Sequence, residues 1–319
     1  MATLSLSALA LTGCAVQASS TSFAGEACDR GVNDTQLAEL VTVSGDAGAA
    51  PEVTLASPLR FTELAYTELA AGDGTALTQP TQLAVVEISL YDGETGALVI
   101  TTPYDGDLTR LSNIQGWAGQ IPGLGQAMEC AQPGARIIAG LSPDDVGTAA
   151  QQGLGISEES SVVAIIDVLK TYHPRAEGTL QYNDLQNLPT VVRGQTGQPG
   201  ITVPNKTAPT ELVTEVLIKG DGEPLAAGQS FRAHYTGVLW ADNEIFDSSW
   251  EGGVPTQFSL DSLVPGVAQA LEGQTVGSQV LVVVPPELGY GDTAQGTIPA
   301  NSTLVFVFDI LGIDGSPES

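Results

Sequence analysis

The chain has 319 residues, of which 42% are hydrophobic, so it is long enough to form two domains with ordinary cores. It carries 10 basic and 37 acidic residues, a formal net charge of −27. Because this charge repels phosphate backbones, a nucleic-acid partner is not expected. An acidic surface mainly favours solubility, and it also attracts basic polypeptides.

The first residues form a short apolar run that ends at a cysteine. Residues 4–11 alternate Leu with Ser and Ala, and Leu11-Thr12-Gly13-Cys14 closes the run. Such a run is too short to span a bilayer and is typical of a signal peptide. The string ending at Cys14 resembles a bacterial lipobox. It predicts a signal peptide over 1–13 and an extracytoplasmic protein anchored to the cell membrane by a lipidated Cys14. No Lys or Arg precedes the run, which leaves a secreted protein as the alternative.

Residues 14–45 are predicted to be a tether, because residues 19–25 are small and polar. Beyond Cys14 only Cys28 and Cys130 remain. In an oxidising compartment an isolated pair is most simply a disulfide, which would fasten the start of the mature chain to the first domain. Two buried free thiols are the alternative.

The first half of the chain repeats the second half in degraded form. Corresponding segments share Pro and Gly at turns and β-branched residues in strands. The pairs are 51–55 with 199–203, 72–74 with 220–222, 121–123 with 264–266, 142–144 with 285–287, and 162–167 with 304–309. The repeat predicts two tandem domains of one fold, over 46–171 and 187–315, joined by a linker at 172–186.

The pattern of apolar residues predicts the same few elements in both halves. The β-branched runs 279–284 and 303–310 are bounded by Gly and Pro and indicate strands. Short helices are predicted at 264–271 and at its counterpart 121–128, and helices are otherwise scarce. A Pro- and Gly-rich stretch at 193–204 predicts a long hairpin entering the second domain. We expect an α+β fold in which a twisted, mainly antiparallel sheet wraps around one short helix in each half.

Five short strings in the second half identify a family. They are His234-Tyr235-Thr236-Gly237, Phe246-Asp247-Ser248-Ser249, Leu263-Val264-Pro265-Gly266, Gly289-Tyr290-Gly291 and Thr303-Leu304-Val305-Phe306. Their order and spacing resemble the FKBP family of peptidyl-prolyl cis-trans isomerases over residues 187–315. The resemblance implies two FKBP-like domains in tandem, of which the second is the isomerase.

The residues in these strings suit the chemistry that the resemblance implies. Rotation about an X-Pro amide has a barrier of ~18–20 kcal/mol, and it needs no nucleophile, metal or cofactor. A dry aromatic pocket whose hydrogen bonds fit the twisted amide better than the planar one is enough. The resemblance implies catalytic roles for five residues: Tyr235, Phe246, Asp247, Tyr290 and Phe306. Asp247 is interpreted as a buried carboxylate that favours the twisted amide, and Tyr290 as a donor to a substrate carbonyl.

Further residues are expected to bind the substrate, and some depart from the family pattern. The predicted contacts are Leu263, Val264, Val267, Ile298 and Trp250. Thr256 and Val267 stand where the family commonly has a second Phe and a Trp at the floor of the pocket, and Gly252 stands where an Arg often pairs with the pocket Asp. Losing part of the Trp surface weakens binding by about tenfold. Trp250 is interpreted either as a compensating contact or as an exposed loop residue.

The first half lacks the chemical groups of the pocket. At the positions of the five catalytic residues it has Ile88, Val99, Ile100, Gly147 and Ala164. These replacements keep strand propensity but remove the aromatic walls, the carboxylate and the hydroxyl. A domain that folds without catalysing is expected. The only two histidines, His173 and His234, have no ligand-spaced partners, so no metal site is predicted. Strand alternation directs the His234 side chain to the face of the strand opposite that of Tyr235, away from the pocket.

The resemblance implies an isomerase that assists the folding of exported proteins. Its partners would be proline-containing, unfolded or partly folded polypeptides, with a macrolide as a further ligand. The alternative is a catalytically weak or inactive FKBP-like chaperone or binding module at the cell surface, as the losses at Val267 and Thr256 and the altered first half suggest.

Overall fold

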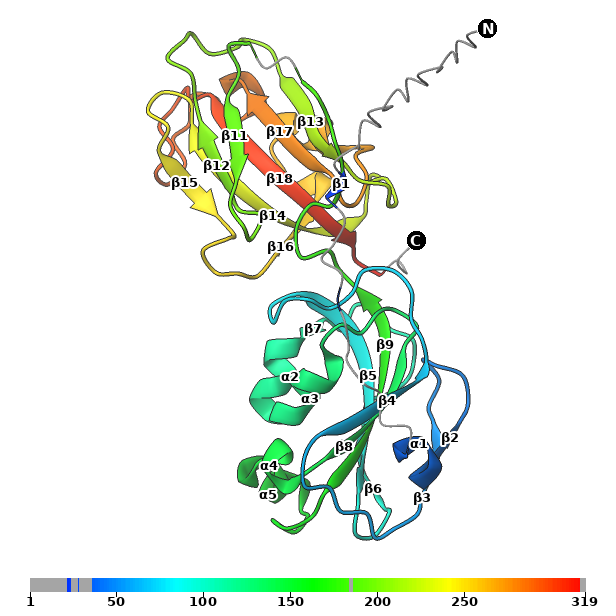
Figure 1. Ribbon diagram of the computed structural model, residues 1–319. Coiled ribbons are helices and arrows are strands. Elements are labelled where there is room, and N and C mark those ends of the chain that lie inside the picture. The colour runs from blue at the N-terminus through cyan, green and yellow to red at the C-terminus, as the bar shows by residue number, and fades with distance from the viewer. Residues whose placement is uncertain (1–21, 24–27, 29–35, 184–185, 316–319) are drawn as a thin grey trace, which may run out of the picture.

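The computed structural model describes residues 22–23, 28, 36–183 and 186–315, and it forms two lobes, each built on its own twisted sheet (Figure 1). The predicted signal peptide and Cys14 lie outside the described residues. Among the described residues, none of the helices is long and apolar enough to cross a membrane.

The first lobe is a six-stranded sheet with helices against one face. Its strand order is β4-β8-β9-β5-β6, and β7 also pairs with β5. The sheet strands are β4 (Ala65–Ala70), β5 (Leu83–Asp92), β6 (Leu98–Thr101), β7 (Ser112–Asn113), β8 (Arg136–Leu141) and β9 (Val162–Thr171). The helices are α2 (Ile114–Gln120), α3 (Pro122–Met128), α4 (Pro143–Val146) and α5 (Thr148–Leu154). Figure 1 shows α2 and α3 beside β5.

The second lobe is an eight-stranded sheet that wraps one helix. Its strand order is β1-β10-β13-β17-β18-β14-β15, and β16 also pairs with β14. The strands are β1 (Ser22–Phe23), β10 (Gly178–Leu180), β13 (Val213–Lys219), β14 (Ser230–Leu239), β15 (Ile245–Ser248), β16 (Thr256–Ser259), β17 (Gln279–Val284) and β18 (Leu304–Ile313). The helical segments are η1 (Leu260–Ser262), α6 (Pro265–Leu271) and η2 (Pro286–Leu288). A separate hairpin joins β11 (Thr190–Arg193) to β12 (Pro199–Thr202).

The two sheets have the same core order. In each, the first of four long strands pairs with the third, the third pairs with the last, and the last pairs with the second, which carries two short strands at its edge. The register agrees as well: Tyr235 lies opposite Phe308 in the second lobe, and Ile88 lies opposite Ile166 in the first. The spatial order therefore parallels the sequence correspondence.

Most of the predicted elements are present. The strand expected at 279–284 is β17. The strand expected at 303–310 is β18, which begins one residue later and continues to Ile313. The expected hairpin is formed by β11 and β12. Both predicted helices begin with Pro in their first turn, where the missing N–H has no partner to lose. The sequence patterns missed α2, although Asn113 caps it by accepting from the Gly116 N–H at 2.7 Å, and they missed α4 and α5.

The predicted tether was wrong for residues 36–45. These residues form α1 (Leu37–Leu40) and β2 (Val41–Ser44), and β2 pairs with β3 (Glu52–Leu55). Leu37 and Val41 are each 1% exposed and pack on the sheet of the first lobe with Ile138 and Ile165. Two apolar anchors four residues apart hold this segment against the sheet, so the first domain begins at residue 36 or earlier.

The predicted linker was also wrong in part, because several of its residues pack on the second lobe. Strand β10 pairs with β13, and the Tyr172 hydroxyl donates to Asp314 Oδ1 at 2.9 Å. The His173 N–H donates to the Leu311 carbonyl at 2.9 Å. Tyr172 is 1% exposed. The connection is therefore a packed joint rather than a solvated spacer.

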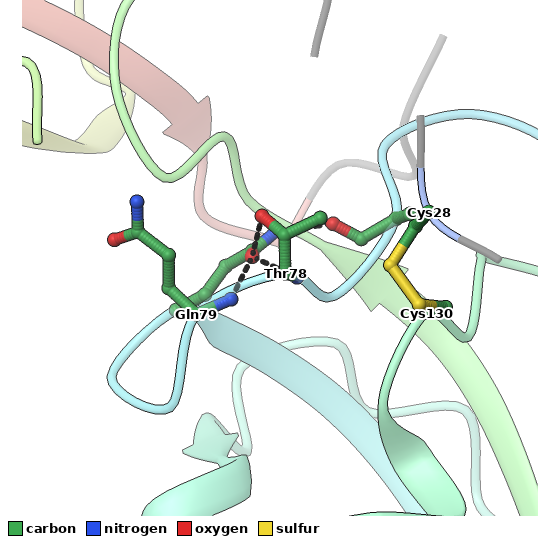
Figure 2. Close-up of a disulfide and its surroundings, with 6 residues drawn as sticks. Cys28, Thr78, Gln79 and Cys130 are labelled. Carbon is green, nitrogen blue, oxygen red and sulfur yellow. Dashed lines mark hydrogen bonds between the residues drawn. A yellow bond between two sulfur atoms is a disulfide. The ribbon is translucent and has the colours of Figure 1, made fainter. Parts of the chain in front are cut away.

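Cys28 and Cys130, the pair predicted from the sequence, form a disulfide in the structure, with 5.4 Å between their Cα atoms (Figure 2). Cys130 follows α3, and its N–H donates to the Leu77 carbonyl at 2.8 Å. Thr78 and Gln79 lie beside the bond, where both N–H groups donate to the Gln82 side chain. The disulfide therefore fixes Cys28 to the helix-bearing face of the first lobe.

Candidate active site

The inner face of the second sheet carries a continuous aromatic cluster. Strand alternation turns Phe231, Ala233 and Tyr235 of β14 toward α6, and Phe306 and Phe308 of β18 join them in one core. The aromatic residues of β14 and β18 come into contact because these two strands pair along nearly their whole length.

Four aromatic rings, those of Phe246, Phe306, Phe308 and Tyr235, pack against one another on this face. Phe246 packs edge-on against Phe306, with ring centroids 5.5 Å apart and an interplanar angle of 86°. Tyr235 stacks on Phe308 at 5.7 Å. Gly237 makes room for this arrangement, because a Cβ atom there would lie 2.4 Å from Phe246 Cζ. The predicted wall residues Tyr235, Phe246 and Phe306 are therefore brought together.

Tyr235 and Asp247 form a polar pair at the edge of this cluster. The Tyr235 hydroxyl donates to Asp247 Oδ2. Burial, followed by the bond to Asp247, raises the pKa of Tyr235 well above its usual value, so the hydroxyl keeps its proton. Asp247 itself is exposed, and its interpretation as a buried carboxylate was wrong, because β15 is the edge strand of the sheet.

The predicted apolar contacts line the same core. Val267 and Ile298 are buried in it, and Leu263 and Val264 pack against it in a half-buried position. Val264 and Val267 flank the start of α6, which Pro265 begins. Tyr290 is 39% exposed and lies within electrostatic range of Tyr235. The cluster therefore has an apolar interior and a rim that carries two hydroxyls and one carboxylate.

Trp250 does not belong to this site. Its ring stacks on His234 with centroids 4.1 Å apart, and His234 faces away from Tyr235, as strand alternation predicted. The Ser249 hydroxyl lies 2.9 Å from His234 Nδ1. Trp250 is also half-buried rather than exposed. Both interpretations of Trp250 were therefore wrong.

Phe258 and Phe308 were missed by the sequence reasoning. Phe258 packs edge-on against Tyr235 at 5.3 Å and against Phe308 at 5.7 Å. Phe258 lies two residues beyond Thr256 on β16, so the two share a face of the strand. Alternation along β16 was the signal that could have found Phe258. The Phe258 ring partly offsets the absence of an aromatic residue at Thr256.

The first lobe places aliphatic residues at the corresponding positions. Ile100 lies opposite Leu90 just as Asp247 lies opposite Gly237. Ile88 and Ala164 are buried in the core of that lobe, and Val99 is half-buried. Within the described part of the chain, no group of His, Cys, Asp or Glu is arranged to hold a metal ion.

His234 and Asp309 lie opposite each other in the β14–β18 ladder and are both buried. Burial lowers the pKa of His234 from 6.5 to about 4 and raises that of Asp309 from 3.8 to about 6. Between pH 4 and 6 the unfolded chain binds the extra proton at the histidine, so this group makes stability rise with pH. At Asp309 the folded chain holds the extra proton, so stability falls as pH rises.

These opposed slopes, each up to about 1.4 kcal/mol per pH unit, should nearly cancel in the wild type. As pH rises from 4 to 6, the free energy of unfolding of His234→Gln is expected to fall relative to that of wild type. The free energy of unfolding of Asp309→Asn is expected to rise relative to wild type over the same range. Urea unfolding at three pH values in this window measures both differences. Curves parallel to wild type for both variants would show that neither group has a shifted pKa.

Comparisons with known proteins agree with the site. The family model described as FKBP-type peptidyl-prolyl cis-trans isomerase matches residues 222–311, which include the aromatic cluster. A Corynebacterium glutamicum protein named "Probable FK506-binding protein" is 36% identical over 114 residues, which cover 36% of this chain and 97% of that protein. The "FK506-binding protein" of Streptomyces anulatus is 34% identical over 120 residues, covering 36% and 97%.

A longer relative shares the same region. The isomerase FkpA of Escherichia coli K12 is 37% identical over 114 residues, which cover 36% of this chain and 42% of FkpA. The crystal structure of FkpA from Escherichia coli aligns with a TM-score of 0.31 and 33% identity, over 40% of this chain and 53% of that one. A relative matched over nearly its whole length, together with the family model over the aromatic lobe, establishes that the chain belongs to the FKBP-type peptidyl-prolyl cis-trans isomerases.

Proposed function

We propose that the second domain isomerises X-Pro bonds in its aromatic cluster and that it does so without covalent chemistry. The observation that carries this proposal is the Tyr235–Asp247 pair at the edge of an otherwise apolar site. Phe246, Phe306 and Ile298 provide apolar surface for a proline ring, which favours binding from water.

The charged rim supplies the preference for the twisted amide. When rotation breaks amide resonance, the carbonyl oxygen loses negative charge and the carbonyl carbon becomes more positive. The carboxylate of Asp247, held by Tyr235, favours that charge distribution more than the planar one. Val267 leaves a smaller apolar floor than a Trp would, so the isomerase is a weak one.

We further propose that residues 36–171 form a degenerate FKBP-like domain and that the isomerase domain begins with the linker. The shared strand order and register support this, as does the aliphatic set Ile88, Val99, Ile100 and Ala164. No group of the pocket chemistry remains there, so the first domain does not catalyse.

The proposed clients are exported polypeptides with proline, met outside the cytoplasm. The Cys28–Cys130 disulfide supports this location, because disulfides persist in oxidising compartments. The lipobox-like string at Cys14 supports a lipid anchor. Uncatalysed isomerisation takes ~10–100 s, so an isomerase there speeds folding. Relatives named for FK506 binding support a macrolide as an alternative occupant of the pocket.

Tyr290→Phe tests the role of the second hydroxyl. Removing one neutral hydrogen bond to a substrate carbonyl costs about 1 kcal/mol, so kcat/KM should fall roughly fivefold. A peptide cis-trans isomerisation assay measures it. Tyr182→Phe, at a fully exposed tyrosine, is the matched control and should leave kcat/KM unchanged. Equal turnover in both variants would remove Tyr290 from the mechanism.

A further inference from the structure

Strand β6 forms an open edge of the first sheet. The sheet ends there, since β6 pairs with β5 on one side and, among the described residues, with no strand on the other. Alternate residues of an edge strand direct their N–H and C=O groups outward. This edge therefore offers backbone hydrogen bonds to another extended chain.

Two side chains of β6, Leu98 and Ile100, are apolar and exposed, and a register shift that leaves Val99 unpaired puts them on opposite faces of the sheet. Leu98 is 52% exposed and lies opposite Tyr91, and Ile100 is 53% exposed and lies opposite Leu90. Residues 96–102 contain no charged group. Sheet edges usually carry charges that prevent pairing. In the second lobe the equivalent edge, β15, has such a charge at Asp247, whereas the first lobe has Ile100 in its place.

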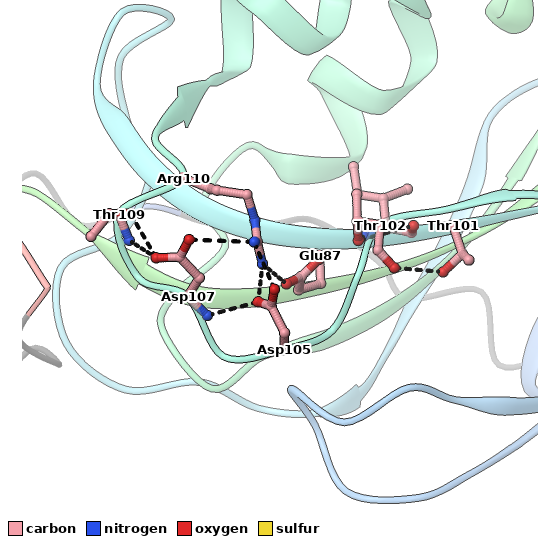
Figure 3. Close-up of polar contacts among 8 residues, drawn as sticks. Glu87, Thr101, Thr102, Asp105, Asp107, Thr109 and Arg110 are labelled. Carbon is pink, nitrogen blue, oxygen red and sulfur yellow. Dashed lines mark hydrogen bonds and ion pairs between the residues drawn. The ribbon is translucent and has the colours of Figure 1, made fainter.

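Acidic turns border the apolar edge at both ends. Before β6, Glu94 pairs with Arg60 at 2.9 Å, while Asp92 accepts hydrogen bonds from the Glu94 N–H at 3.1 Å and the Thr95 hydroxyl at 2.8 Å. Beyond β6, Asp105, Asp107 and the buried Glu87 surround the single cation Arg110, close to Thr101 and Thr102 (Figure 3). Each end therefore keeps an excess of negative charge, so basic groups at both ends of a bound segment are favoured.

We propose that the β6 edge binds extended, apolar polypeptide segments flanked by Lys or Arg, which add to the sheet as a further strand. The open backbone selects an extended chain, Leu98 and Ile100 select apolar side chains on both faces, and the acidic turns select basic flanks. A second copy of this chain fits poorly, because its own acidic turns would approach those of the first. The proposal goes beyond the proposed isomerase function, since it gives the non-catalytic domain a client-binding surface.

The test uses the full chain and a fluorescent, proline-free peptide with six apolar, β-branched residues and two lysines at each end. Anisotropy titration should show binding that weakens with salt. The same peptide with glutamates in place of lysines should bind at least tenfold more weakly. Leu98→Lys/Ile100→Lys should abolish binding, and Leu98→Thr/Ile100→Thr, which keeps strand propensity, should weaken it by about tenfold.

Ile245→Lys is the matched control, because Ile245 is equally exposed (56%) on the equivalent strand β15. It should bind the peptide as wild type does. Hydrogen exchange should slow in residues 97–101 when the peptide is present. Isomerase activity on a short proline peptide should stay unchanged in the β6 variants, so the two proposals fail separately. Unaltered binding by both β6 double variants, no binding by wild type, or a wild-type dimer that these variants convert to monomers would each overturn the proposal.

Discussion

Asp167→Ala is expected to destabilise the first domain by about 3–5 kcal/mol, the usual cost of leaving a buried charge without its partner. Asp167 is fully buried, and it accepts from Arg136 Nε and Nη2 at 2.7 Å each. Arg136 is 2% exposed and also donates to the carbonyls of Gly45 and Ala49. Without the carboxylate the guanidinium stays in the core, and the contact that holds the 45–49 turn is strained.

Urea unfolding followed by circular dichroism measures the loss. Glu94→Ala is the control, because it breaks the exposed Arg60–Glu94 pair and should cost less than about 1 kcal/mol. Arg136→Met/Asp167→Leu removes both charges and should recover much of the stability. If Asp167→Ala and Glu94→Ala cost the same, the buried pair does not stabilise the first domain.

Gly237→Ala is expected to lower kcat/KM by about tenfold to a hundredfold while the protein stays folded. The new Cβ would lie 2.4 Å from Phe246 Cζ and 3.1 Å from Phe306 Cε1, so Phe246 must leave its position in the pocket wall. Overpacking of this kind costs typically about 1–3 kcal/mol, and here the cost falls on the substrate-binding surface. The peptide isomerisation assay measures the change.

Gly252→Ala provides the matched control in the neighbouring loop. A Cβ there would meet only the Ser249 carbonyl oxygen, at 3.9 Å, so activity and stability should match wild type. Full activity in Gly237→Ala, with circular dichroism unchanged, would show that the position of Phe246 does not matter for turnover.

The sequence predicted those parts of the fold that depend on local patterns. The runs at β17 and β18 are continuously apolar and β-branched, and Pro265 marks the start of α6, so both were found. Segments held by long-range packing were missed. Residues 36–45 were assigned to the tether because the partners of Leu37 and Val41, which lie on β8 and β9, are about a hundred residues away in the chain.

The site was predicted in composition but not in full geometry. Short strings identified Tyr235, Phe246 and Phe306, whose rings the structure brings together. The sequence neighbours of a loop residue do not determine which face of the sheet its side chain packs on. Trp250 was therefore predicted on the pocket face, whereas its ring stacks on His234. Asp247 was expected to be buried because edge position depends on strand order, which no local pattern shows.

The central claim is that catalysis is confined to the aromatic site of the second domain, and one pair of variants tests it most directly. Phe246 of β15 and Val99 of β6 occupy equivalent positions in the two lobes. In a peptide isomerisation assay on the full chain, Phe246→Ala should remove most of the turnover, because it deletes a wall of the proline pocket. Val99→Ala should leave turnover at the wild-type level. Turnover that survives Phe246→Ala, or that is lost in a folded Val99→Ala variant, would contradict the claim.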